Sequence, residues 1–300
     1  MKTLIILILL AVFAISLSAQ AKSPEEEAKQ KAELAAKNKF IEEQNVAFIQ
    51  GNKLFAEKAY NEAFKIYADI IKKYLGVIPD HPGLPSIVIN ASLAMRMSMT
   101  DTYNVAIKSG PAAEKDPAIA KARDETLESA RAGFRRAAEL ANTAVKLAFD
   151  ADISPKFANA NTKAQYLSAL LNRVEAVSVV AQYVEHAVSD ETHQVFLQFL
   201  AVEKDAVNKQ KAWLKLAKLY SDTGDLEKAN AIYAMILKDS PDNIDALFHG
   251  GTCLMAMSDK PGMITAAGYL KRFLKLAPTN DPRRKDAQDQ LDYLKIFEIN

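Results

Sequence analysis

The stretch from Trp213 to Asn243 constrains the fold more than any other part of the chain, because its large residues recur at helical intervals. In WLKLAKLYSDTGDLEKANAIYAMILKDSPDN, two runs each place their bulky side chains on one stripe of a helix. The stripe residues are Trp213, Leu216 and Tyr220 in the first run and Ala229, Tyr233 and Ile236 in the second. Small residues at Ala217 and Ala229 let the two axes approach closely. The stretch therefore predicts two helices packed side by side.

Three residues mark where these helices begin and end. Gly224 accepts the left-handed conformation that often ends a helix, and Asp225 can cap the helix that follows. Pro241 prevents the second helix from continuing. The two helices therefore form an antiparallel hairpin with a short turn.

This pattern resembles the tetratricopeptide (TPR) unit of about 34 residues, here at 210–243. The resemblance implies an all-α chain, a right-handed α-solenoid of antiparallel helix hairpins. It also implies a scaffold that binds proteins and is not an enzyme. In agreement, no alternating strand pattern follows the first 20 residues.

Other segments repeat the pattern less regularly. A unit at 244–278 ends at Pro278, with its extra length expected in the turn around Asp259 to Gly262, and another match lies at 44–77. One period before the clear unit, 176–209 keeps only apolar positions such as Val195 and Phe199. The predicted organisation is a signal peptide at 1–21, a charged helix at 22–43, a TPR-like unit at 44–77, an irregular long-helix insert at 78–175, TPR-like units at 176–278 and a capping helix at 279–300.

The insert is also expected to be helical. A first helix is predicted at about 86–108 and a second from Pro117 to about Asp150, on the order of 50 Å long. The segment between Lys108 and Ser129 is either an insertion or an extension of that second helix. At the other side of 44–77, Ser23 followed by Pro24 has the order of a helix start, so a solvated helix should run into the first unit. A coiled-coil arm is the alternative for that helix.

The first 21 residues have the order of an export signal. Lys2 precedes an apolar run from Leu4 to Leu17, and Ala19-Gln20-Ala21 offers a cleavage site. We expect cleavage after Ala21 and a periplasmic or secreted protein with no later membrane span; an uncleaved signal anchor is the alternative. Loss of Lys2 would leave equal numbers of basic and acidic residues, which does not favour nucleic acid as a partner.

The sequence offers no convincing catalytic, metal or cofactor site. The four histidines, His81, His186, His193 and His249, include no pair at the helical i, i+4 spacing of a metal site. The one cysteine, Cys253, excludes an internal disulfide and fits a small buried side chain. We therefore expect no enzyme activity, no cofactor and no metal.

What remains is binding of another protein or peptide. In the resemblance, fixed places on the first helix of each hairpin line a groove, and they correspond here to Asn45, Phe48, Asn52, Phe55, Lys211, Leu214, Lys218, Ser221, Asp245, Phe248, Thr252 and Met255. Asn52 matches one member of the arrangement that binds acidic peptide tails, but Phe48 stands where a lysine would be needed, so a mixed apolar and polar groove is expected.

The leading hypothesis is an exported scaffold in the cell envelope. A ligand-binding or enzymatic module within 85–205 and self-association through the N-terminal helix are the alternatives; a homo-oligomer is not otherwise indicated.

Overall fold

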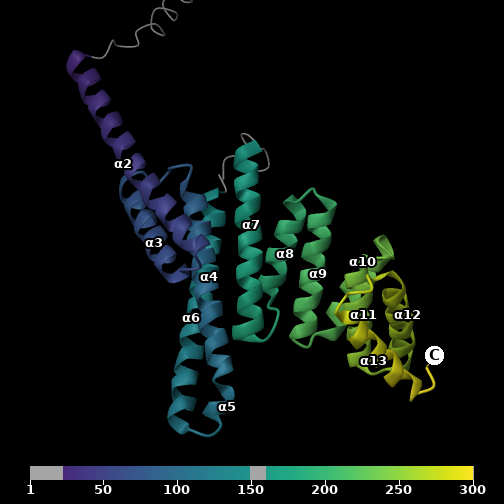
Figure 1. The fold of residues 1–300 in the computed structure, drawn as a ribbon. Helices are drawn as coiled ribbons and strands as arrows, with labels where there is room; N and C mark the ends of the chain where they lie inside the picture. Colours follow the sequence, from purple (N-terminus) through teal and green to yellow (C-terminus); the bar gives the residue numbers. More distant parts are fainter. Residues whose placement is uncertain (1–22, 149–159, 300) are drawn as a thin grey trace, which may run out of the picture. The chain divides into compact units, whose positions relative to one another are not determined.

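A computed structural model describes residues 23–148 and 160–299, and all of its regular elements are helices (Figure 1). The all-α prediction is therefore confirmed. The chain divides into two compact parts, Met1–Gln50 and Gly51–Asn300. The predicted signal peptide and its cleavage site lie outside the described residues. None of the helices in the described ranges combines the length and apolar character needed to cross a membrane.

Helix α2 (Pro24–Ala56) begins at a reciprocal cap. Ser23 Oγ accepts a hydrogen bond from the Glu26 N–H at 3.2 Å, and the Ser23 N–H donates to Glu26 Oε2 at 2.9 Å. Every side chain from Pro24 to Lys39 is exposed. The first part of α2 is thus a solvated helix, as predicted, because its alternating charges and alanines give it no apolar stripe to bury.

The larger part of the chain starts at Gly51, inside the predicted 44–77 unit. Helix α3 (Tyr60–Val77) buries Ala63, Tyr67, Ile70 and Tyr74, which recur at helical spacing. Gly51 in the last turns of α2 lies under the ring of Tyr67, where an added Cβ would meet Cε1 at 2.7 Å. The missing side chain at Gly51 therefore makes room for the Tyr67 ring.

The irregular middle region is a long hairpin of α4 (Leu84–Lys108) and α6 (Pro117–Ala148), joined by the short α5 (Gly110–Ala113). α6 buries a stripe made mostly of alanine against α4, and Ser92 Oγ donates to the Ala137 carbonyl at 2.8 Å inside this contact. Both expectations for 108–129 hold in part, since α5 is inserted and α6 is extended at its N-terminal end.

The next hairpin consists of α7 (Ala160–Val180), a π-helical turn η2 (Ala181–Glu185) and α8 (Asp190–Val202). Ser189 caps α8 by accepting from the Thr192 N–H. The boundary predicted between residues 175 and 176 falls inside α7. The first helix of this hairpin therefore begins well before the predicted 176–209 unit. Counting back one period assumed helices of ordinary length, whereas α7 with η2 is longer than the first helix of the clear unit.

The clear unit consists of α9 (Ala206–Asp222) and α10 (Leu226–Asp239), with Gly224 at φ +89° and Asp225 capping α10. The following unit consists of α11 (Ile244–Met257) and α12 (Lys260–Leu276). The extra residues expected in its turn are absent, because only Ser258 and Asp259 separate the two helices; α11 has 14 residues against 17 in α9, and α12 has 17 against 14 in α10. Pro261 occupies the first turn of α12 because Asp259 caps that helix through the Gly262 N–H at 2.7 Å.

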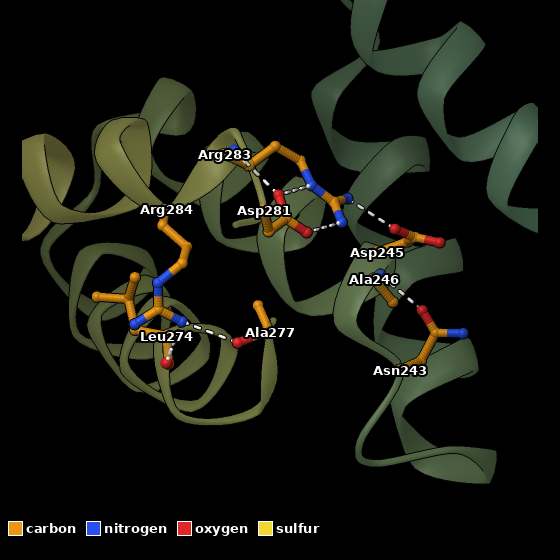
Figure 2. A network of polar contacts seen from close by, with 8 residues as sticks. All are labelled: Asn243, Asp245, Ala246, Leu274, Ala277, Asp281, Arg283 and Arg284. Atoms are coloured by element: carbon orange, nitrogen blue, oxygen red, sulfur yellow. Dashed lines mark hydrogen bonds and ion pairs between the residues drawn. The ribbon is translucent and has the colours of Figure 1, made fainter. Parts of the chain in front are cut away.

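Helix α13 (Arg283–Lys295) closes the last unit through a polar network (Figure 2). Arg283 bonds Asp281 and reaches Asp245 on α11 at 2.6 Å. Arg284 Nη1 donates to the carbonyls of Leu274 and Ala277, which end α12. The predicted capping helix at 279–300 thus contacts both helices of the hairpin before it.

Candidate functional site

A groove of about 540 Å³ lies between α7 and α9, with α8 behind it. Figure 1 shows the three helices side by side, α8 between the other two. The residues that line the groove are Ala164, Leu167, Ser168, Leu171, Val174 and Glu175 on α7, Phe199 and Glu203 at α8, and Asn208, Lys211, Ala212 and Lys215 on α9. This volume is within the range of roughly 300–1,000 Å³ of sites that bind small molecules or anchor side chains.

Helical spacing explains why these residues share one space. On α7 the lining positions recur every three or four residues, as they do on α9, so each set covers a single helix face. Small side chains at Ala164, Ser168 and Ala212 leave room between the helices. Leu171 is 47% exposed although it lies beside buried Val174 and Phe199. The groove thus has an apolar floor that the chain itself leaves partly uncovered.

One end of the groove carries a half-buried charge cluster. Glu175 Oε2 accepts from Arg96 Nη1 of α4 at 3.1 Å and from Lys215 Nζ of α9 at 2.5 Å. Burial acts to raise the pKa of Glu175, but the two cations outweigh it and hold that pKa below its ordinary value. Glu175 therefore links α4, α7 and α9 as a charged carboxylate.

The second carboxylate of the groove belongs to the start of α9. Glu203 Oε1 accepts from the backbone N–H groups of Asp205 and Lys204 at 2.9 and 2.7 Å, and Oε2 accepts from Asn208 Nδ2 at 3.2 Å. The backbone bond from Asp205 contributes most to lowering the pKa of Glu203. This side chain is buried and satisfied, so its role is to hold the turn between α8 and α9.

These environments do not favour acid–base chemistry. A general acid needs a raised pKa, whereas both groove carboxylates are held in the charged form. His193 shares a hydrogen bond of 2.8 Å with the Tyr220 hydroxyl, and desolvation lowers the pKa of His249. Within 23–148 and 160–299, no three His, Cys, Asp or Glu side chains are arranged to hold a metal ion. The groove is suited to binding an apolar segment between charged rims.

The first set of predicted binding residues lies on α2. Asn45 is exposed and Phe48 is half-buried, both within Met1–Gln50. In the larger part, Asn52 Oδ1 accepts from the Tyr67 hydroxyl at 2.8 Å and from Asn90 Nδ2 at 3.2 Å. Phe55 packs against Tyr60 with ring centroids 5.1 Å apart. Asn52 and Phe55 therefore already contact neighbouring helices.

The remaining predicted residues differ in their surroundings. Lys211 lines the groove and Lys218 pairs with Asp222, while Leu214, Ser221 and Met255 are half-buried. On α11, Asp245 pairs with Arg283, Phe248 is buried, and Thr252 Oγ1 accepts from Gln290 Nε2 at 3.2 Å. The Arg283 guanidinium lies 5.5 Å from the Phe248 ring centroid. Asp245, Phe248 and Thr252 therefore contact α13, although the Asp245 side chain remains 50% exposed, and the binding role of the α11 positions stays a prediction.

Most of the residues that line the groove were not predicted, because the unit that holds this hairpin was expected to begin at residue 176, inside α7. Lys211 alone belongs to both sets. A usable signal was present in YLSALLNRVEAVSVV, where Leu167 and Leu171 widen the apolar stripe formed by Tyr166, Leu170 and Val174. A stripe wider than one neighbouring helix can cover indicates a second contact surface.

Comparison with known proteins identifies the repeat. Residues 211–243 match the model of the family described as Tetratricopeptide repeat. None of the curated proteins matches the chain. Among solved structures, the chain is similar to YrrB, a TPR protein with an unusual peptide-binding site, at 12% identity over 78% of this chain and 86% of that one, with a TM-score of 0.36. It is also similar to the TPR2AB domain of yeast Sti1 in its pHSP90 complex, at 11% identity over 83% and 97%, with a TM-score of 0.25.

Proposed function

On the premise that this chain is a tetratricopeptide-repeat protein, with its matched repeat at 211–243, we propose that it is a non-enzymatic scaffold that binds a segment of another protein between α7 and α9. The observation that carries the proposal is the groove itself, whose floor leaves Leu171 47% exposed beside buried Phe199. An apolar side chain from a partner would remove that surface from water, which favours binding. The alternative of an enzymatic module within 85–205 lacks such support, because the groove carboxylates are engaged by cations and backbone groups.

A peptide-display experiment tests this function. A random peptide library is selected on residues 22–300, and the enriched peptides are measured against Leu171→Asp and against Ile264→Asp as the matched control. Ile264 is 56% exposed on α12, so the same change there keeps the charge and leaves the groove intact. We expect at least about tenfold weaker binding for Leu171→Asp, because a charge in an apolar contact must be desolvated, and no change for the control. Failure to enrich peptides, or equal binding by both variants, would contradict the proposal.

We also propose that this binding takes place outside the cytoplasm, in the cell envelope or beyond it. The support is the order of Lys2, the apolar run from Leu4 to Leu17 and the small residues before Lys22. Mass spectrometry of the exported chain should show Lys22 as the first residue. An intact N-terminus starting at Met1 in the membrane fraction would instead indicate a retained anchor.

A further inference from the structure

The charged side chains that line the groove, Glu175, Glu203, Lys211 and Lys215, balance one another, and Arg96 of α4, which bonds Glu175, adds one positive charge. Arg96 and Lys215 share a single carboxylate oxygen of Glu175, so the three side chains together have a net charge of +1. Arg96 Nε is buried and has no hydrogen-bond partner in the described part of the chain. This cluster therefore has donors and positive charge beyond what Glu175 satisfies.

Lys211 adds a further cation at the same rim. It lies one helical turn before Lys215 on α9, is exposed, and forms no ion pair with any residue that the structure describes. The other groove carboxylate, Glu203, keeps its negative charge, but its oxygens accept from the Lys204 and Asp205 N–H groups and from Asn208, and it forms no ion pair with Lys211. Unpaired positive charge therefore faces a groove whose floor is apolar.

The helix directions place this charge next to exposed apolar surface. α7 and α9 are each antiparallel to α8, so they run the same way (Figure 1). Lys215 of α9 contacts Glu175 of α7, so these two residues lie at the same level. One helical turn toward the N-terminus of each helix, Lys211 of α9 therefore lies at the level of Leu171 of α7. A segment lying on Leu171 would bring its neighbouring side chains to the two lysines.

We propose that the groove binds a partner segment in which an acidic side chain adjoins apolar ones, the carboxylate being bound by Lys211 and Lys215 while the apolar side chains cover Leu171. This proposal rests on the proposed function of the groove and states the chemistry of its occupant. A basic residue at that place would be repelled by both lysines, and a neutral one would leave Lys211 unpaired in a region from which the partner excludes water. Lysine ammonium groups suit this task, because each is a flexible point charge that can turn from Glu175 or solvent to an incoming carboxylate.

The test uses a peptide enriched by display on residues 22–300, acetylated and amidated so that only side chains carry charge. Three forms, with Glu, Gln or Lys at the residue next to the apolar anchor, are measured by fluorescence anisotropy against the wild type, Lys211→Gln and Lys271→Gln. Lys271 is exposed on α12, away from the groove, and is the matched control for the loss of one positive charge.

We expect the Glu form to bind about 5- to 20-fold more tightly than the Gln form, and Lys211→Gln to abolish most of that difference while Lys271→Gln preserves it. The preference should weaken as salt is raised, because the rim is partly exposed.

If the Glu and Gln forms bind the wild type equally, or if Lys271→Gln acts like Lys211→Gln, the inference is overturned although the groove still binds peptides. A Gln form with a free C-terminal carboxylate that matches the Glu form would show that a chain end, and not a side chain, is recognised, and would also overturn it. Absence of binding by every form would instead contradict the proposed function.

Discussion

The face of α11 and the groove between α7 and α9 are both formed by the first helices of hairpins. A following helix, α13, covers part of the α11 face, whereas the apolar floor of the groove stays partly exposed. On α11, Asp245, Phe248 and Thr252 contact α13, and Arg283 lies over the Phe248 ring. Between α7 and α9, Leu171 remains 47% exposed and Lys211 has no ion pair in the described residues. The difference teaches that a position in the repeat does not by itself make a binding residue, because the helix that follows decides whether its face is covered.

Matched leucine substitutions test this comparison with the largest expected effect. Leu270 of α12 is fully buried and Leu171 is half exposed, so the same change to alanine removes very different amounts of packing. We expect Leu270→Ala to lower the free energy of unfolding by about 2–5 kcal/mol and Leu171→Ala by about 1 kcal/mol or less. Urea denaturation of both variants measures the two losses. Equal losses would mean that the groove floor is as tightly packed as the closed unit.

A glycine pair tests how closely the helices of the closed unit approach. A Cβ at Gly251 would lie 2.9 Å from Leu270 Cγ, whereas one at Gly268 would meet no atom within 4 Å. Gly251→Ala should therefore destabilise the protein by about 1–3 kcal/mol through overpacking, and Gly268→Ala should stabilise it by up to about 1 kcal/mol through its helix propensity. Thermal unfolding should show melting temperatures that move in opposite directions. A rise in both would show that α11 and α12 can separate at little cost.

The same contrast explains what the sequence could predict. The buried stripes of α9 and α10 follow from spacing alone, and Leu216, Tyr233 and Ile236 are buried as expected. The groove was missed because counting repeat periods locates helices only when all of them have similar lengths. α7 together with its π-helical turn is longer than α9, the first helix of the clear unit, so its position was predicted wrongly. Pro261-Gly262 was likewise interpreted as a turn, although the cap at Asp259 makes it the start of a helix.

Covering of the α11 face depends on contacts between elements that sequence patterns do not specify. Phe248 was itself expected to line a groove, but it is buried against Phe273 with ring centroids 5.1 Å apart. Conversely, Arg96 and Glu175 are far apart in the sequence and meet only because α4 packs beside α7. Charged pairs of this kind need the tertiary arrangement before they can be assigned a role.

The smallest expected effect concerns the charge that helps to hold the covered face. Asp281 accepts hydrogen bonds from the Arg283 side chain at 2.7 and 3.0 Å and from its backbone N–H at 2.9 Å, and these bonds lower the pKa of Asp281 from 3.8 to about 2. Because the folded pKa lies below the ordinary value, the stabilisation is fully present above about pH 4 and is lost as the pH falls toward 2. Asp281→Asn should therefore be less stable than the wild type at pH 5, and the difference should shrink as the pH is lowered. Urea denaturation across this range measures it, and a difference that stays constant with pH would show that Arg283 holds α13 through its stacking on Phe248 and Phe273 and not through this carboxylate.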